Sequence, residues 1–124
     1  PGSWRFDKRD VVPGEHVLIG DATEPWPFEN QSVRLIIACQ VWEHLYLDRR
    51  AFAFSEAQRV GQMLLMTIPF EWETGSKSHL RLNDNVVCKW SGGLPADYRK
   101  TSGPEGRRRR MYFWLGLHPK KNPN

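Results

Sequence analysis

The feature that most constrains the fold is a pair of short apolar runs between residues 16 and 45, each followed directly by polar residues. The first run ends at Gly20 and Asp21, and the second, residues 33–39, ends at Gln40. Each run is too short for a helix and rich in β-branched residues, which is typical of strands buried on both faces of a parallel sheet. In open α/β sheets the ligand binds outside the carboxyl ends of the strands. We therefore expect any chemistry to centre on Asp21 and Gln40.

After residue 46 the apolar residues follow a helical period. We predict a helix that Asp48 caps and Gly61 ends, with Arg49, Arg50, Glu56 and Arg59 mostly on its outer face. The apolar stripe of this helix consists of Leu47, Ala51, Phe54, Ala57 and Val60. Residues 63–68 predict a third buried strand, which Pro69 and Phe70 close.

The last third of the chain begins with a segment that has no clear period, residues 70–82, which we predict to be a loop. Asn83 or Asp84 can cap a short helix that the pair Gly92 and Gly93 ends. Residues 96–101 and 110–117 then predict two strands of an antiparallel hairpin at the edge of the sheet.

The stretch from Gly20 to His44 resembles the middle of the class I S-adenosylmethionine-dependent methyltransferases, particularly the type 11 branch. Those proteins carry a strand ending in Gly-Asp-Ala, a Pro-Phe turn, a polar loop, a strand like FDLVV and a segment like QVLEH. The matching pieces are Gly20-Asp21-Ala22, Pro27-Phe28, Glu29-Asn30-Gln31-Ser32, residues 33–39 and Gln40-Val41-Trp42-Glu43-His44. The resemblance implies an α/β fold with a Rossmann-like methyltransferase sheet, truncated at the N-terminus, and a C-terminal antiparallel hairpin.

The main departure from that family is a missing glycine-rich turn of the GxGxG type, which lets the methionine part of the cofactor approach closely. In the family this turn follows a strand at the centre of the sheet. Its absence predicts a gap one strand wide between the strand at residues 16–19 and the strand at residues 33–39. Either the first of these strands moves inward, or a second copy of the chain fills the gap, and we favour a homodimer.

The resemblance also implies which residues bind S-adenosylmethionine. Residues 4–7 predict a short strand that ends at Asp7, the candidate for the ribose hydroxyls, with Asp10 as the fallback. A solvated terminus is the alternative for both. Asp21 is expected to accept hydrogen bonds from the adenine amino group, and the Ala22 amide to contact the ring. The alternative for Asp21 is a cap of the following turn.

Three further side chains complete the expected cofactor site. By their match to the family motifs, Trp26 and Phe28 flank the adenine, Gln40 faces the methionine end, and Trp42 packs against the sheet. The alternative for the aromatic residues is a plain core position, which is common for Trp and Phe.

Glu43 and His44 raise the question of a metal, because some RNA and quinone methyltransferases hold a divalent cation with an ExxEH arrangement. Gln40 replaces the first Glu of that motif here. Two ligands and one neutral amide make a poor cation site, so we predict no metal. Cys39 and Cys88 have no metal or disulfide spacing, and we predict that both are reduced core residues.

The function implied by the resemblance is methyl transfer from S-adenosylmethionine to an unidentified acceptor, either within a larger parent or by ancestry only. Such a transfer is a direct displacement, so no side chain is needed as a covalent intermediate. The alternative is an inactive methyltransferase-like module that binds protein or nucleic acid through a basic hairpin. The run Arg107, Arg108, Arg109 and Arg110, on a chain of formal net charge +4, can contact phosphates, or it can simply begin a strand.

Composition sets the remaining limits. The 124 residues suit one domain, and 40% hydrophobic content excludes a disordered chain. No apolar run is long enough to span a bilayer and no signal peptide opens the sequence, so we expect no membrane partner and a cytoplasmic protein. We expect residues 1–3 to be a tag remnant, 4–117 to be the methyltransferase-like domain and 118–124 to be a flexible tail.

Overall fold

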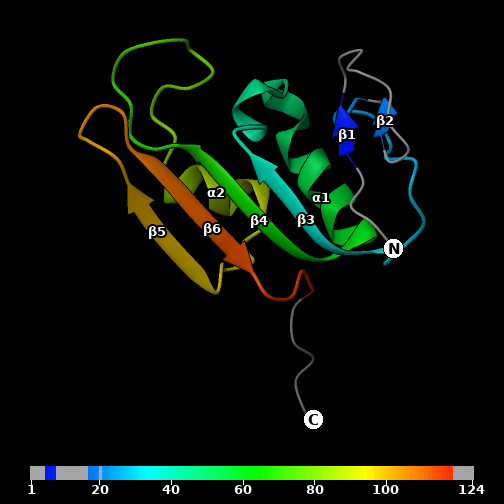
Figure 1. The fold of residues 1–124 in the computed structure, drawn as a ribbon. Coiled ribbons are helices and arrows are strands. Elements are labelled where there is room, and N and C mark those ends of the chain that lie inside the picture. Colours follow the sequence, from blue (N-terminus) through cyan, green and yellow to red (C-terminus); the bar gives the residue numbers. More distant parts are fainter. Residues whose placement is uncertain (1–4, 8–16, 20, 119–124) are drawn as a thin grey trace.

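A four-stranded sheet forms the centre of the molecule (Figure 1). The structure is a computed structural model that describes residues 5–7, 17–19 and 21–118. The sheet contains β3 (Val33–Cys39), β4 (Gly61–Pro69), β6 (Arg109–Trp114) and β5 (Tyr98–Ser102), in that spatial order. β3 is parallel to β4, whereas β6 is antiparallel to both β4 and β5. The predicted hairpin at the edge of an α/β sheet is therefore confirmed.

Two α-helices and two short 3₁₀ turns connect these strands. The turns η1 (Trp42–His44) and η2 (Leu47–Arg49) lead into α1 (Arg50–Val60), and α2 (Asp84–Trp90) follows the loop after β4. Asn83 caps α2 as predicted, because its side-chain oxygen accepts a hydrogen bond of 3.1 Å from the Val86 amide. Asp48 does not cap α1, since it lies inside η2 and the helix begins two residues later with no side-chain cap.

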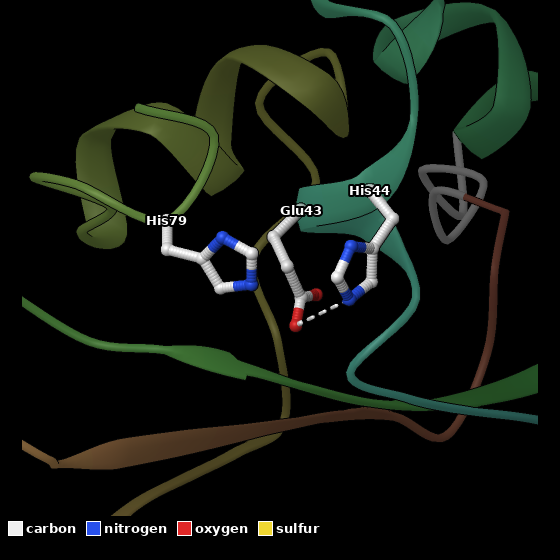
Figure 2. Close-up of side chains that lie close together, drawn as sticks. All are labelled: Glu43, His44 and His79. Atoms are coloured by element: carbon white, nitrogen blue, oxygen red, sulfur yellow. Dashed lines mark ion pairs between the residues drawn. The ribbon is translucent and has the colours of Figure 1, made fainter. Parts of the chain in front are cut away.

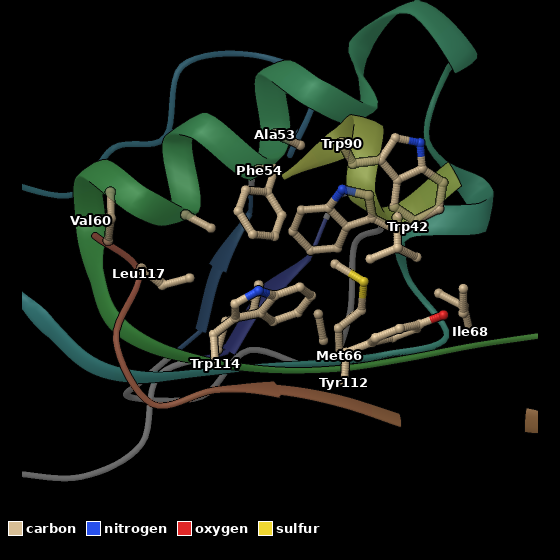
Figure 3. Packing of buried hydrophobic residues seen from close by; sticks show 14 of the residues in the cluster. Trp42, Ala53, Phe54, Val60, Met66, Ile68, Trp90, Tyr112, Trp114 and Leu117 are labelled. Atoms are coloured by element: carbon tan, nitrogen blue, oxygen red, sulfur yellow. The ribbon is translucent and has the colours of Figure 1, made fainter. Parts of the chain in front are cut away.

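Both α-helices cover the same face of the four-stranded sheet, and the core lies between these helices and the sheet (Figures 1 and 3). The sheet contributes alternate residues such as Met66 and Tyr112, as expected for strands with one packed face. Phe54 of α1 is fully buried and meets Trp42 and Trp114 edge-on, with ring centroids 6.4 and 5.1 Å apart. Trp42 therefore packs in the core over the sheet, as the sequence predicted.

The predicted apolar stripe of α1 is confirmed for Phe54, Ala57 and Val60, but the burial of other residues differs from the prediction. Leu47 is 79% exposed and Ala51 is exposed, whereas Arg50 and Glu56 are only 2% and 8% exposed. The reason for Leu47 is the turn η2, which changes the helical phase ahead of α1. Arg50 and Glu56 are buried because each finds hydrogen-bond partners in another segment, described below.

β3 is packed on one face only, which corrects the expectation of burial on both. Leu35 and Ile37 are 39% and 61% exposed, because both described helices lie on the opposite face. Cys39 continues this exposed side, and Cys88 lies on the outer side of α2, so the predicted core positions for both cysteines are wrong.

The N-terminal strands form a separate two-stranded parallel sheet. β1 (Arg5–Asp7) pairs with β2 (Val17–Ile19), with Asp7 opposite Ile19. The two strands were predicted, but the inward shift of the second one is not observed, because β2 pairs with β1 and not with β3. The connecting residues 8–16, which include Asp10, lie outside the described part of the chain, as do residues 1–4 and 119–124.

The helices of the described residues are short. None of them combines the length and the apolar character that crossing a bilayer requires.

Candidate functional site

Asp21 lies two residues after the end of β2. Its carboxylate accepts the hydrogen bonds that stabilise the next turn. The backbone amide and the hydroxyl of Thr23 donate to Asp21 Oδ1 at 2.9 and 2.7 Å. The backbone carbonyl of Asp21 accepts from the Glu24 amide at 3.0 Å. This is the turn-capping role that the sequence left open. The turn engages the Asp21 carboxylate, and its contact with adenine stays a prediction.

Trp26 belongs to the core more than to an open pocket. Its side chain is 8% exposed, and its indole N–H donates to the Ala22 carbonyl at 2.9 Å. The ring of Phe6 from β1 lies 6.0 Å from that of Trp26 and 5.6 Å from that of Phe28. These contacts tie the two-stranded sheet to the loop after β2. Phe28 keeps an intermediate exposure, so it is the more accessible of the two predicted aromatic neighbours of adenine.

A charged clamp on α1 holds this same loop in place. Glu56 Oε1 accepts from the Trp26 amide at 2.8 Å, and Glu56 Oε2 pairs with Arg59 Nε at 2.7 Å. Arg59 in turn donates to the carbonyls of Trp26 and Phe28 at 2.9 and 2.7 Å. The hydrogen bonds from Arg59 hold the pKa of the Glu56 carboxyl below its usual value. We define Glu56 and Arg59 as the α1 clamp.

Gln40 follows β3 directly and has an unusual backbone conformation. Its φ of 58° lies in the left-handed region, where non-glycine residues are uncommon. Its amide donates to the Thr67 carbonyl at 2.9 Å, and its side-chain Nε2 donates to Thr67 Oγ1 at 3.1 Å. The turn therefore directs Gln40 at the carboxyl ends of β3 and β4, the edge where the sequence placed the site.

Asp7 ends β1, as predicted for the ribose-binding residue. Only its backbone is described, so its proposed contact with the ribose hydroxyls stays a prediction.

Glu43, His44 and His79 form a side-chain cluster that the sequence did not bring together (Figure 2). Their potential ligand atoms all lie within 4.8 Å of one another, and the Glu43 carboxylate lies between the two imidazoles. Glu43 is fully buried, and neither carboxylate oxygen has a hydrogen-bond partner among the described residues. Its carboxylate oxygen Oε2 lies 3.9 Å from His44 Nε2.

Burial dominates the electrostatics of this cluster. It raises the pKa of Glu43, an effect that the backbone N–H of Glu43 and then the neighbouring His44, Arg109 and Arg50 only partly offset. The pKa of His79 is lowered, first by burial and then by repulsion from His44, Arg109 and Arg50. His79 is therefore a neutral imidazole at pH 7, and its Nδ1 lies 2.9 Å from the Ser78 hydroxyl.

Arg50 and Trp72 position the two segments that carry the cluster, which are η1 and the loop with His79. Arg50 Nη2 donates to the Glu43 carbonyl at 2.8 Å and reaches the Ser78 carbonyl at 3.5 Å, which joins η1 to the loop that carries His79. The ring of Trp72 stacks on His79 with centroids 6.0 Å apart, and its indole donates to the Arg108 carbonyl at 2.7 Å. The cluster thus joins η1 to the loop of residues 70–82. Its members Glu43 and His44 follow Gln40 by three and four residues in the sequence.

The arginine run begins β6 and alternates between two environments. Arg107 and Arg109 are exposed, whereas Arg108 and Arg110 are half-buried. Arg108 pairs with Glu71 at 3.2 Å, and Arg110 makes two bonds to Asp84 of 3.1 and 3.0 Å. Half of the run is therefore engaged within the chain, in line with the strand interpretation, and binding of nucleic acid stays a prediction.

Two hollows in the described surface lie elsewhere. One of about 360 Å³ is lined by Gln58 and residues 91–95, and one of about 150 Å³ includes Asp84 and Tyr112. Neither is lined by a residue predicted to bind the cofactor.

The strand order and connections can now be compared with known proteins. No protein-family profile matches the sequence, and no curated protein matches it. Solved structures do match the fold of this chain. The chain has an α/β fold that it shares with solved methyltransferases, and it covers only part of the length of those chains.

Three solved structures illustrate this similarity. The PH0226 protein of Pyrococcus horikoshii OT3 has a TM-score of 0.64 and 12% identity, over 82% of this chain and 59% of that one. A Sulfolobus solfataricus protein named as a candidate type 11 methyltransferase has a TM-score of 0.61 and 13% identity, over 88% and 64%. Magnesium protoporphyrin IX methyltransferase (ChlM) of Synechocystis PCC 6803, solved with bound S-adenosylmethionine, has a TM-score of 0.55 and 12% identity, over 78% and 43%. The chain thus spans between 43% and 64% of their lengths.

Proposed function

We propose that this chain carries the adenine-binding part of the S-adenosylmethionine site of a cytoplasmic methyltransferase. The observation that supports the proposal is the shared fold, in which the segment after β2 and the turn after β3 both present polar side chains. Asp21 and Gln40 occupy these two positions. A carboxylate and a side-chain amide can bind a nucleoside, because their oxygens accept hydrogen bonds from its amino and hydroxyl groups.

The residues present fit the adenosine half of this cofactor. A glycine-rich turn that admits the methionine half is not among the 124 residues of the sequence. When bound, S-adenosylmethionine supplies an activated methyl group. The role of this chain is to orient the cofactor: the Asp21 carboxylate accepts from the adenine amine, the Ala22 amide donates to the ring, and Gln40 faces the methionine end. Correct placement of the reacting atoms supplies most of the catalysis that such a displacement needs.

The experiment compares wild type with Asp21→Asn in the complete product of the gene that encodes this chain. The Asn side chain keeps an oxygen for the Thr23 amide, so the turn is retained, but its NH₂ group cannot accept from the adenine amine. Binding of S-adenosylhomocysteine by calorimetry should weaken by about tenfold, the equivalent of one lost hydrogen bond of roughly 1.4 kcal/mol.

A matched control is Thr23→Val, which removes the hydroxyl bond to Asp21 and leaves the carboxylate in place. This variant should lower stability while the affinity for S-adenosylhomocysteine stays that of wild type. A wild-type product without measurable affinity, or an Asp21→Asn product that binds like wild type, contradicts the proposal.

A further inference from the structure

We infer that Glu43, His44 and His79 form a binding site for a divalent transition-metal cation, with Zn²⁺ as the ion that suits it best. The inference does not depend on methyl transfer. It rests on the ligand types, on the burial of Glu43 and on the convergence of three potential ligand atoms within 4.8 Å.

The donor set identifies the class of ion. One carboxylate and two imidazoles are common ligands of Zn²⁺ and of neighbouring first-row metals. Mg²⁺ and Ca²⁺ prefer oxygen ligands, and this cluster offers oxygen from a single side chain. The Nδ1 atom of His79 lies 2.9 Å from the Ser78 hydroxyl, which leaves Nε2 available for an ion.

The state of Glu43 is the second, independent observation. A fully buried carboxylate without a hydrogen-bond donor carries a large desolvation penalty unless a cation compensates it. Arg50 lies close, but its donors serve the carbonyls of Glu43 and Leu45 and not the carboxylate. A bound cation resolves this deficit. The competing explanation is a carboxyl group that stays protonated and binds nothing.

The geometry allows the ligands to close on an ion. Metal–ligand bonds of about 2.0–2.2 Å in a tetrahedron bring ligand atoms roughly 3.3 Å apart, so the most distant ligand atoms of the cluster must approach by up to about 1.5 Å. The His44 side chain is 61% exposed and His79 lies in a loop, so both imidazoles have room to rotate towards Glu43. Three protein ligands leave a fourth position open, as in metal sites that bind a substrate or water.

The test is Zn²⁺ titration by calorimetry after treatment with a chelator. Both exposed cysteines are first replaced, Cys39→Ser and Cys88→Ser, so that no thiol can bind the metal. We expect one Zn²⁺ per chain, and His79→Ala should weaken binding by at least about tenfold. His118→Ala is the matched control, because this exposed imidazole contacts Gln31 and lies outside the cluster. It should bind Zn²⁺ like the parent.

Co²⁺ provides a spectroscopic check, since its visible absorption bands report nitrogen and oxygen ligands directly. Glu43→Gln should abolish these bands while thermal unfolding remains cooperative. If Glu43→Gln fails to fold, His79→Ala carries the test, because the His79 side chain is partly exposed. Absence of binding at a large excess of Zn²⁺, unchanged binding in His79→Ala, or tighter binding of Mg²⁺ than of Zn²⁺ overturns the inference. A protonated, metal-free Glu43 is then the remaining explanation.

Discussion

Replacing Glu56 by Ala should destabilise the protein well beyond an ordinary surface substitution. The change leaves the Trp26 amide without its acceptor in a buried position, which costs about 1–3 kcal/mol. It also removes the pair with Arg59, a partly exposed interaction that contributes about 1 kcal/mol at most. The sum is a loss of about 1–4 kcal/mol in the free energy of unfolding.

Glu56→Gln is the matched control for this prediction. The amide oxygen can still accept from the Trp26 amide, so only the charge and its share of the Arg59 pair are lost. We expect a cost of about 1 kcal/mol for this variant. Urea unfolding at neutral pH measures both, with the m-value as a check that the unfolding transition remains comparable. If Glu56→Ala lowers the free energy of unfolding by less than about 1 kcal/mol, the α1 clamp does not stabilise the loop at Trp26.

The same variant gives a pH dependence with a definite sign. The pKa of Glu56 is lowered in the folded state, chiefly by the hydrogen bonds from Arg59. A carboxyl with a lowered pKa contributes stability above its usual value of 4.5 and loses it as the pH falls through the folded value. The stability difference between wild type and Glu56→Gln should therefore be constant near neutral pH and shrink below 4.5. A difference that grows on acidification contradicts this assignment.

Three other predictions concern the core, α2 and self-association. Phe54→Ala should cost about 3–5 kcal/mol in urea unfolding, since the ring is fully buried; a cost below 2 kcal/mol would contradict the packing described. Tyr112→Phe removes the 2.6 Å bond to Asp84 and should cost about 1 kcal/mol; no loss would show that the bond contributes nothing net. The homodimer expected from the sequence, in which a strand of a second copy pairs beside β3, predicts concentration-dependent sedimentation; a monomer at all concentrations excludes it.

The sequence predicted those parts of the fold that depend on local signals. β-Branched runs bounded by turn residues located β3 and β4, Asn83 marked the start of α2, and Gly103 and Gly106 lie in the hairpin turn with positive φ. These signals act over a few neighbouring residues. They say nothing of how many faces a strand buries, so the exposure of Ile37 was missed.

The errors at α1 have a different origin. Hydropathy places charged residues outside, but the carbonyls of Glu43 and Leu45 satisfy Arg50 in a buried position. Glu56 is buried because the Trp26 amide, from a distant segment, donates to it. The spacing of Glu56 and Arg59, three residues apart on a helix, was the available signal for the pair. No such signal linked His79 to Glu43, because a loop without periodicity brings them together.

The central claim is that the segments after β2 and β3 bind the adenosine part of S-adenosylmethionine. The most direct measurement is the amide NMR spectrum of the complete gene product, titrated with S-adenosylhomocysteine. We predict that the largest shifts fall on Ala22 and Gln40, with smaller ones at Phe28. Shifts confined to the hollow at residues 91–95 or to the hairpin of β5 and β6, or no shifts at saturating ligand, would contradict it.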